Sequence, residues 1–287
     1  MSLFGKKRGK RGCGCFTIIF LLCAVIVAVL FIDSNTRIVT QYYDVQTAKI
    51  PSPFDGYRIA LLSDIHNKEF GSENEKLLAA VSGAKPNIIA VTGDLIDGDG
   101  QLDRMLVLMG RLSDIAPTYY VTGNHEWATS DARELLRRLP EYGVTVLENK
   151  YEVITIDGET ITLVGFGDPN GPADQPTRED VMNGIPQELR DGYVVALNHR
   201  NMYFEQMATL GVDLILCGHA HGGTIRLPGT DGLRDHSGWF PTRTNGLYDA
   251  EYNGASAVAL VSRGLGNAYH VPRFMNNPHV AVAVLRP

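Results

Sequence analysis

Hydrophobic residues are arranged in two different patterns along this chain. Residues 16–32, FTIIFLLCAVIVAVLFI, form a run without a charged side chain and without a polar face. Such a run favours a membrane-spanning helix over a buried core helix, which would keep one polar side. From residue 57 onward, short apolar runs alternate with segments in which apolar residues recur every three or four positions. This second pattern predicts buried strands separated by amphipathic helices.

The region after residue 57 predicts a mixed α/β domain. Its first part is expected to form strands at 58–62, 87–92 and 118–122, and helices at 73–84, 102–115 and 131–142. Closely spaced strands follow at 144–147, 151–156 and 160–166, with Asp157-Gly158 as a hairpin turn between the last two. The remaining expected elements are a helix at 202–210 and strands at 193–197, 213–217, 255–262 and 279–285. We therefore expect one α/β domain over residues 57–287, preceded by a connector over residues 35–56.

The apolar run is expected to be an uncleaved membrane anchor over residues 12–34. A helix needs about 20 apolar residues to cross a bilayer core of about 30 Å, and residues 12–32 carry no charge. A cleaved signal peptide, the alternative, has a shorter apolar region and a cleavage site of small residues, which the segment FIDSNTRIV lacks. Residues 1–11 carry five basic residues and no acidic residue, which predicts a cytoplasmic tip. The domain is then expected outside the cytoplasm, on a single-pass plasma-membrane protein.

Composition and charge narrow the class of protein. The chain is 44% hydrophobic and 20% charged, which is typical of globular proteins and excludes disorder throughout. The net charge is −6, but the chain without its basic tip has 21 basic against 32 acidic residues. An excess of this sign disfavours binding to a nucleic-acid backbone. Cys217 is the only cysteine after residue 23, so no disulfide is expected within the domain.

Potential metal ligands follow the predicted strands where each strand ends. Five of the eight histidines lie in these positions. Since ligands bind beyond the carboxyl ends of strands in α/β sheets, we expect these side chains to lie close together. The alternative, in which each is a turn residue or a helix cap, needs five separate explanations. The clusters in chain order are Asp64 with His66, Asp94 with Asp97, Asn124 with His125 and Glu126, His199, and His219 with His221.

The residue types in these clusters indicate a hydrolytic centre with two metal ions. Cysteine is absent from the clusters, which excludes a zinc–thiolate or iron–sulfur site. Carboxylate and imidazole ligands suit Mn, Fe or Zn in an open site. Seven candidate ligands are too many for one ion, and they suit two ions about 3.5–4 Å apart that share a carboxylate.

The ordered motifs resemble the calcineurin-like metallophosphoesterase superfamily. Its pattern, D-x-H, G-D-x-x-D, G-N-H-[DE], a lone His and G-H-x-H, is present here as DIH, GDLID, GNHE, His199 and GHAH. An anchor before the domain looks like the bacterial YkuE-like and UDP-2,3-diacylglucosamine pyrophosphohydrolase-like branch. The resemblance implies a four-layer α/β/β/α sandwich. One departure is the motif NHRN at residues 198–201, where many relatives have a small residue before the His and a proline after it.

The resemblance also implies roles for individual residues. Asp94 would bridge two divalent metal ions, and His125 would act on the substrate as a catalytic group. In this assignment one ion is held by Asp64, His66 and His221, and the other by Asn124, His199 and His219. A water molecule between two such ions loses its proton near neutral pH and becomes the nucleophile. The expected reaction is hydrolysis of a phosphodiester or pyrophosphate bond. The alternatives are a phosphomonoesterase or protein phosphatase with the same site, and a metal-binding scaffold without catalysis.

Further residues are candidates for supporting the metals and the substrate. Asp97 and Glu126 are expected either to orient ligand imidazoles or to cap helix starts. The aromatic residues of the loop 222–253 are expected to form a substrate wall or a satellite core. The expected partners are a phosphorylated small molecule or lipid, and the bilayer through residues 12–34, with no nucleic acid. Candidates for a phosphate clamp, which could also be structural, are Arg200, Arg226 and Arg263.

Overall fold

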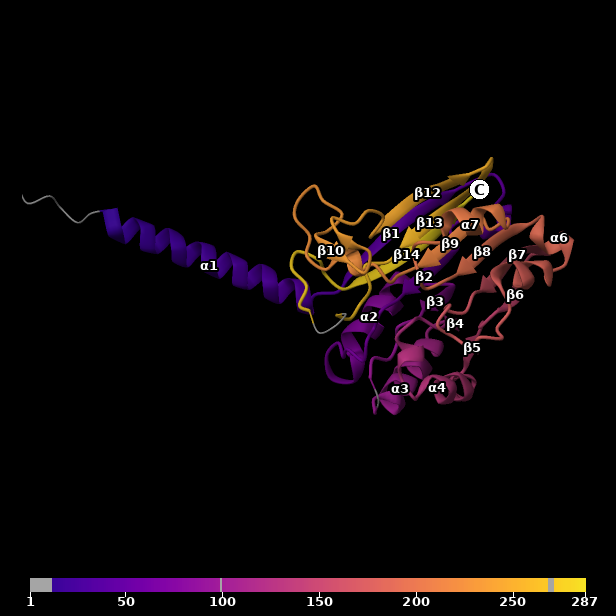
Figure 1. The fold of residues 1–287 in the computed structure, drawn as a ribbon, viewed down its shortest axis with the longest axis horizontal. Helices are drawn as coiled ribbons and strands as arrows, with labels where there is room; N and C mark the ends of the chain where they lie inside the picture. The colour runs from indigo at the N-terminus through magenta and orange to yellow at the C-terminus, as the bar shows by residue number, and fades with distance from the viewer. Residues whose placement is uncertain (1–11, 99, 268–270) are drawn as a thin grey trace, which may run out of the picture.

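The computed structural model describes residues 12–98, 100–267 and 271–287, so the predicted basic tip lies outside the described residues. Two six-stranded sheets pack face to face, and helices cover their outer faces (Figure 1). The first sheet contains β1 (Val39–Gln46), β14 (His279–Arg286), β2 (Arg58–Leu62), β3 (Ile88–Thr92), β4 (Thr118–Val121) and β5 (Val144–Val146), in that spatial order. The second contains β12 (Gly246–Tyr252), β13 (Ala255–Val261), β9 (Leu214–Cys217), β8 (Tyr193–Leu197), β7 (Glu159–Gly165) and β6 (Lys150–Ile156).

The helices complete the four layers that the resemblance implies. The outer face of the first sheet packs against α2 (Glu75–Ala84), α3 (Leu102–Ser113) and α4 (Ala132–Arg138). The outer face of the second sheet packs against α5 (Arg178–Asn183), α6 (Gln187–Arg190) and α7 (Phe204–Thr209). The α/β/β/α arrangement is thus confirmed.

Burial on both faces explains why the central strands have continuous apolar sequences. In β2, Ile59 and Leu61 pack into the core between the two sheets, whereas Ala60 and Leu62 pack toward the helices. Neighbouring strands β2, β3, β4 and β5 run parallel, so their carboxyl ends lie at the same edge of the first sheet. Strands β7, β8 and β9 are also parallel to one another. This arrangement brings the strand ends of both sheets to one rim.

The segment 35–56 differs from the predicted connector. It contains β1, which pairs with β14 in parallel over its whole length. The sequence pattern does not reveal this strand because β1 is an edge strand whose residues are largely half-buried or exposed. A strand is likewise present in the loop 222–253, where β12 forms the edge of the second sheet. The domain therefore begins at β1 and not at residue 57.

The helix α1 (Gly12–Thr36) projects away from the domain (Figure 1). Its segment Phe16–Thr36 is long and apolar enough to cross a membrane, and its apolar side chains lie outside the core of the domain. The helix end is fastened to the loop before β14: the Asn35 side chain donates to the Arg273 carbonyl (2.8 Å) and accepts from the Arg273 N–H (3.0 Å). Asn277 donates to the Asp33 carbonyl (2.8 Å). A single N-terminal candidate span is present among the described residues, as the sequence predicts.

Candidate metal centre

Asp94 lies at the middle of the rim where the strand ends meet. It follows β3, and its Oδ2 lies 3.1 Å from His199 Nε2, at the end of β8, and 3.7 Å from His66 Nε2, after β2. His221, after β9, has its Nε2 3.2 Å from His66 Nε2 and 3.4 Å from Asp64 Oδ1. Ligand candidates from both sheets therefore converge on one buried place.

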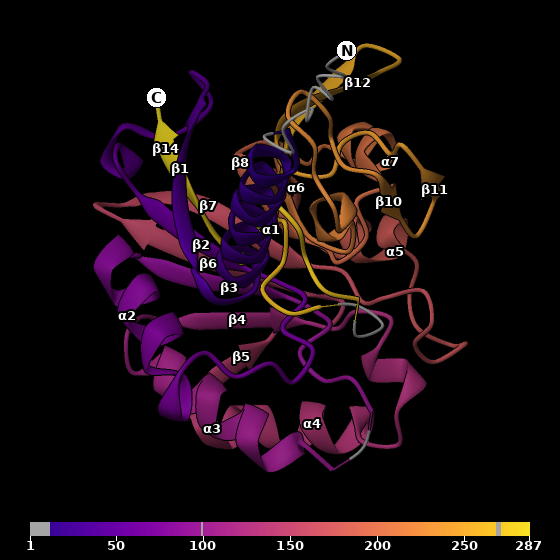
Figure 2. The same cartoon turned by 90° about the vertical axis from the view of Figure 1, so that its left-hand side faces the viewer.

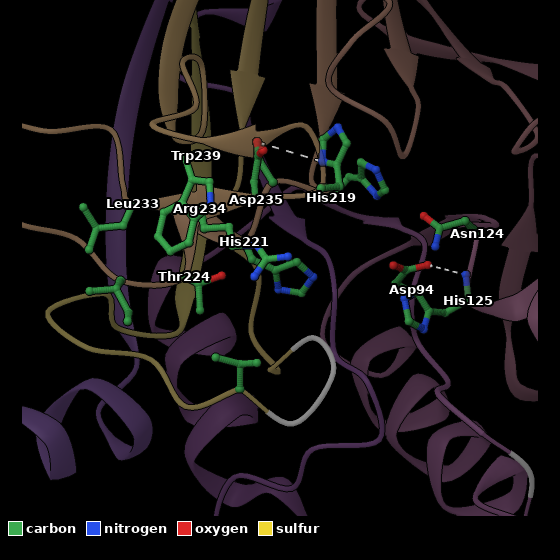
Figure 3. A pocket seen from close by; sticks show the side chains of 14 residues that line it. Asp94, Asn124, His125, His219, His221, Thr224, Leu233, Arg234, Asp235 and Trp239 are labelled. Atoms are coloured by element: carbon green, nitrogen blue, oxygen red, sulfur yellow. Dashed lines mark hydrogen bonds and ion pairs between the residues drawn. The ribbon is translucent and has the colours of Figure 1, made fainter.

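The Asp and His residues form three groups that could each hold a metal ion, and within each group the ligand atoms lie within 4.8 Å of one another. Two of the groups share Asp94: one is Asp64, His66, Asp94 and His221, and the other is Asp94, His199 and His219. The third group is His66, Asp97 and His125. Asn124 lies in the same pocket (Figure 3), and its Oδ1 is buried with no hydrogen-bond partner among the described residues.

The donor set fits divalent cations. The facing Nε2 atoms of His66 and His221, 3.2 Å apart, can share at most one hydrogen bond between them. The two buried carboxylates Asp64 and Asp94 lie beside them, and burial raises the pKa of Asp64. A cation between these groups satisfies imidazole lone pairs and carboxylate charge together. The pattern of donors therefore agrees with two metal ions that share Asp94.

The backbone is strained at five of the seven candidate ligands. Non-glycine residues rarely adopt a positive φ, and clusters of such residues occur at functional sites. Here the left-handed conformation directs side chains from tight strand-to-loop turns toward a common point. The positive values are Asp64 φ 54°, His66 φ 48°, Asp94 φ 51°, His219 φ 68° and His221 φ 49°.

The protein fixes the orientation of His199 through its second ring nitrogen. Nδ1 donates to the Thr92 carbonyl (2.8 Å), so Nε2 is directed at Asp94 and at His219 Nδ1, 3.0 Å away. Burial lowers the pKa of His199, but the Asp94 carboxylate outweighs this effect and raises the pKa to about 10. The Asp94 carboxylate therefore favours positive charge at this position, whether on the imidazole or on a bound cation.

Asp97 and Glu126 have different roles. Asp97 Oδ1 lies 3.0 Å from His125 Nδ1, and its Oδ2 lies 3.4 Å from His66 Nδ1, so this carboxylate contacts two imidazoles as predicted. Glu126 is fully buried and accepts hydrogen bonds from backbone N–H groups of Gly123 (2.6 Å), Asp94 (2.9 Å), Leu95 (2.7 Å) and Ile96 (3.1 Å). These contacts favour the capping alternative for Glu126, because its oxygens tie the loops after β3 and β4 together.

Close contact between those two loops requires a glycine at position 123. A Cβ at Gly123 would lie 2.3 Å from Asp94 Oδ1 and 2.7 Å from the Asp94 backbone nitrogen. We expect Gly123→Ala to displace Asp94 and to lower kcat/KM by roughly a hundredfold or more, because misplacement by about 1 Å has effects of that size. Metal content per purified chain, measured by mass spectrometry, should fall with activity.

Gly83→Ala is the matched control for this prediction. Gly83 lies in α2, and a Cβ there meets no atom within 4 Å. We expect this variant to keep full activity and metal content, with stability unchanged or raised by about 0.5–1 kcal/mol. Equal metal content and activity in the two variants would show that the loop approach at Gly123 is not required.

The three arginines predicted to clamp a phosphate have other partners. Arg200 forms a two-bond ion pair with Asp168 (2.7 and 2.8 Å). Arg226 donates to the carbonyls of Gly222 (3.2 Å) and Asp231 (3.3 Å), and so holds its own loop. The guanidinium of Arg263 donates to Asn245 Oδ1 (3.2 Å). These contacts favour the structural alternative, because each guanidinium already has acceptors within the fold.

A pocket of about 590 Å³ opens beside the cluster (Figure 3). Asp94, Asn124 and His125 lie at one side, and Leu233, Arg234 and Trp239 lie at the other. Arg234 is the arginine that lines this pocket, and the sequence offers no signal for it because its loop has no periodic pattern. Of the residues expected to form a substrate wall, His236 and Trp239 line the pocket, whereas Phe240, Arg243 and Tyr248 do not. The remaining lining residues are His219, Ala220, His221, Thr224, Ile225, Asp235 and Val271.

Comparisons with known proteins agree with this geometry. The family described as calcineurin-like phosphoesterase matches residues 57–223. The metallophosphoesterase YkuE of Bacillus subtilis is 25% identical over 86% of this chain and 85% of its own length. The phosphodiesterase YaeI of Escherichia coli is 30% identical over 60% of this chain and 63% of its own. A transmembrane protein with a metallophosphoesterase domain from Danio rerio is 27% identical over 63% of this chain and 44% of its own. Since the family match covers more than half of the chain and includes every strand end at the centre, the chain belongs to the calcineurin-like phosphoesterases and is a metal-dependent phosphoesterase.

Proposed function

We propose that this protein is a membrane-anchored phosphohydrolase that uses two divalent metal ions to cleave a phosphodiester or pyrophosphate bond. The observation that carries the proposal is the pair of ligand groups that share Asp94, from which Asp94, His219 and His221 line one pocket with His125. The relative YaeI is a phosphodiesterase, which favours a diester substrate. A pocket of this size also leaves room for a substituent on each side of a phosphate.

Individual ligand roles form part of the proposal. Asp94 would be shared by the two ions, one of which Asp64, His66 and His221 would hold, and the other Asn124, His199 and His219. The grouping of the Asp and His ligand atoms supports this division, and the unpartnered Oδ1 supports a ligand role for Asn124. When bound, two divalent ions supply an acidified water molecule and offset the charge on the phosphoryl oxygens.

The protein's own contribution to the reaction is to position groups and to move a proton. His125 lines the pocket, and Asp97 fixes its ring through Nδ1. We propose that His125 donates a hydrogen bond or proton to the leaving oxygen, as a general acid does. The backbone N–H of His125 donates to Asp94 Oδ1 (2.8 Å), so the bridging carboxylate and this imidazole are held in one geometry.

Two chromogenic esters distinguish the candidate reactions. With Mn²⁺ supplied to the purified full chain, we expect hydrolysis of bis-p-nitrophenyl phosphate to exceed that of p-nitrophenyl phosphate by at least about tenfold in kcat/KM, a difference of about 1.4 kcal/mol. If only the monoester is hydrolysed, the protein is a phosphomonoesterase and not the proposed diesterase. A panel of nucleotide and lipid pyrophosphates, assayed in the same way, tests the pyrophosphate alternative.

The proposal places the N-terminus in the cytoplasm and the domain outside it, at the plasma membrane. The five basic residues of the segment 1–11 support this orientation, since Lys and Arg stay on the cytoplasmic side of a span.

Two fractionation experiments test the anchor and the orientation separately. We expect the full chain to remain in the membrane pellet after alkaline carbonate washing. Protease added to intact spheroplasts should digest the domain while a cytoplasmic marker protein stays whole. A domain that is digested only after lysis would contradict the orientation but not the anchor.

A further inference from the structure

Large apolar side chains are exposed on two segments beside the pocket. Among the described residues outside α1, the most exposed large hydrophobic side chains are Phe240 (71%) and Trp239 (69%). Leu227 on the same loop is also exposed, as are Val271 and Met275 in the segment before β14. We call these five residues the apolar rim. Exposed aromatic groups of this size usually indicate a surface that binds a partner.

The end of α1 shows how close the domain lies to the membrane that this helix would cross. Ile32 is 60% exposed, as a lipid-facing residue would be, whereas Ser34 is 1% exposed against the domain. A span of about 20 residues is needed for the bilayer core, and the candidate span Phe16–Thr36 runs to the last residue of α1. No spare segment separates the span from the domain. The face around residues 33–36 must therefore lie at the bilayer surface.

The apolar rim is joined to that same face. Arg273, which is hydrogen-bonded to Asn35 at the end of α1, is followed by Phe274. Phe274 pairs with Ile225 in a parallel β-bridge, and its carbonyl accepts from the Arg226 N–H (3.0 Å). The loop that carries Trp239 starts from this bridge. Figures 1 and 2 show the β10 (Arg234–Asp235) loop on the side of the domain from which α1 projects.

The side chains of the rim suit a lipid headgroup layer. Tryptophan is favoured there because its ring is apolar while its N–H remains in contact with polar groups. The guanidinium of Arg234 lies 5.6 Å from the Trp239 ring centroid, so a cation accompanies the aromatic ring. Trp239 and Val271 also line the pocket. A bilayer surface in contact with the rim would therefore lie directly against the pocket opening.

We propose that Leu227, Trp239, Phe240, Val271 and Met275 form a second contact with the bilayer that α1 crosses. The rim inserts into the headgroup region of the leaflet on the domain side. The pocket then opens onto lipid headgroups and not into bulk solution. This inference rests on the proposed membrane insertion of α1, but it does not depend on the reaction that the metal centre performs.

Tryptophan fluorescence tests the rim in the full chain, which has only Trp127 and Trp239. Full-length Trp127→Phe protein, with Trp239 as its reporter, is reconstituted into phosphatidylethanolamine–phosphatidylglycerol vesicles with or without brominated phosphatidylcholine. We expect the brominated chains to quench roughly half or more of the Trp239 emission, because interfacial side chains lie about 5–10 Å deep at the headgroup and acyl boundary. The Trp239→Phe protein, with the partly buried Trp127, should be quenched much less.

A second control places an exposed tryptophan at the opposite end of the domain. Tyr252 is exposed and pairs with Ala255 at one end of the β12–β13 hairpin. Val261 lies at the other end of this hairpin, beside Cys217 and near the metal centre. Tyr252→Trp in a chain without the two native tryptophans should show no more quenching than Trp127. Vesicle flotation of each preparation reports insertion of α1 separately. If protein that floats with the vesicles shows no more quenching of Trp239 than this control, the proposal is overturned. A partner protein would then be the remaining occupant for the apolar rim.

Discussion

Asp94→Ala is expected to lower kcat/KM by roughly a thousandfold or more, about 4 kcal/mol of transition-state stabilisation, and to leave fewer than two metal ions per chain. The carboxylate belongs to two ligand groups, so its loss weakens the binding of both ions at once. It also accepts the His125 backbone N–H, which would lose its partner. Metal analysis and steady-state kinetics on the same purified protein measure both effects.

A more conservative variant separates the charge of Asp94 from its hydrogen bond. Asp94→Asn keeps an oxygen that can accept the His125 N–H but removes the negative charge. We expect it to resemble Asp94→Ala in metal content. Asp157→Asn is the matched control, since Asp157 lies in the hairpin turn between β6 and β7, where Asn-Gly is equally favourable. Two ions and full activity in Asp94→Asn would exclude a bridging role for this carboxylate.

His125→Ala is expected to lower kcat by roughly a hundred- to ten-thousandfold with little loss of metal, which is the opposite combination to the Asp94 variants. The imidazole lines the pocket and is held by Asp97. If His125 protonates the leaving oxygen, the loss depends on the leaving group. An alkyl p-nitrophenyl diester, which releases the stable nitrophenolate, should lose much less rate than a diester with two alkyl groups.

The leaving-group comparison also identifies what else His125 can do. Equal losses for both esters would assign it to the phosphoryl oxygens, since those are the same in both substrates. Asp97→Asn should show a smaller loss in the same direction, because Asp97 acts through the two imidazole rings that it contacts, those of His125 and His66. Wild-type rates in His125→Ala with both esters would remove the residue from the catalytic machinery.

The sequence is most informative where a residue's environment is set by its nearest neighbours in the chain. Strands such as β2 and β3 are buried on both faces, so their apolar runs mark them directly. The ligand candidates follow these strands immediately, and the parallel order of the sheet then brings them together. For this reason the sheet edge that carries Asp64, Asp94 and His199 is predictable from the sequence alone.

Features that depend on distant parts of the chain are not predictable in the same way. Strand β1 is recognisable only through its pairing with β14, about 240 residues later. Arg200 lies next to a ligand in the sequence, but a buried carboxylate, Asp168, on another loop binds its guanidinium. Arg234 reaches the pocket only because the loop 222–253 folds back over it. In each case the deciding partner is remote in sequence, so local pattern carries no information about it.

The direct junction between α1 and β1 determines how encounters with a substrate depend on concentration. Only Arg37 and Ile38 separate the two elements, so an inserted chain cannot carry its domain away from the bilayer. The enzyme and any substrate that resides in the same leaflet then meet by lateral diffusion in the membrane and not by diffusion through a volume of solution. Turnover of such a substrate would follow its number per membrane area. Adding inert lipid to a fixed amount of enzyme and substrate would slow the reaction even though every bulk concentration stayed the same.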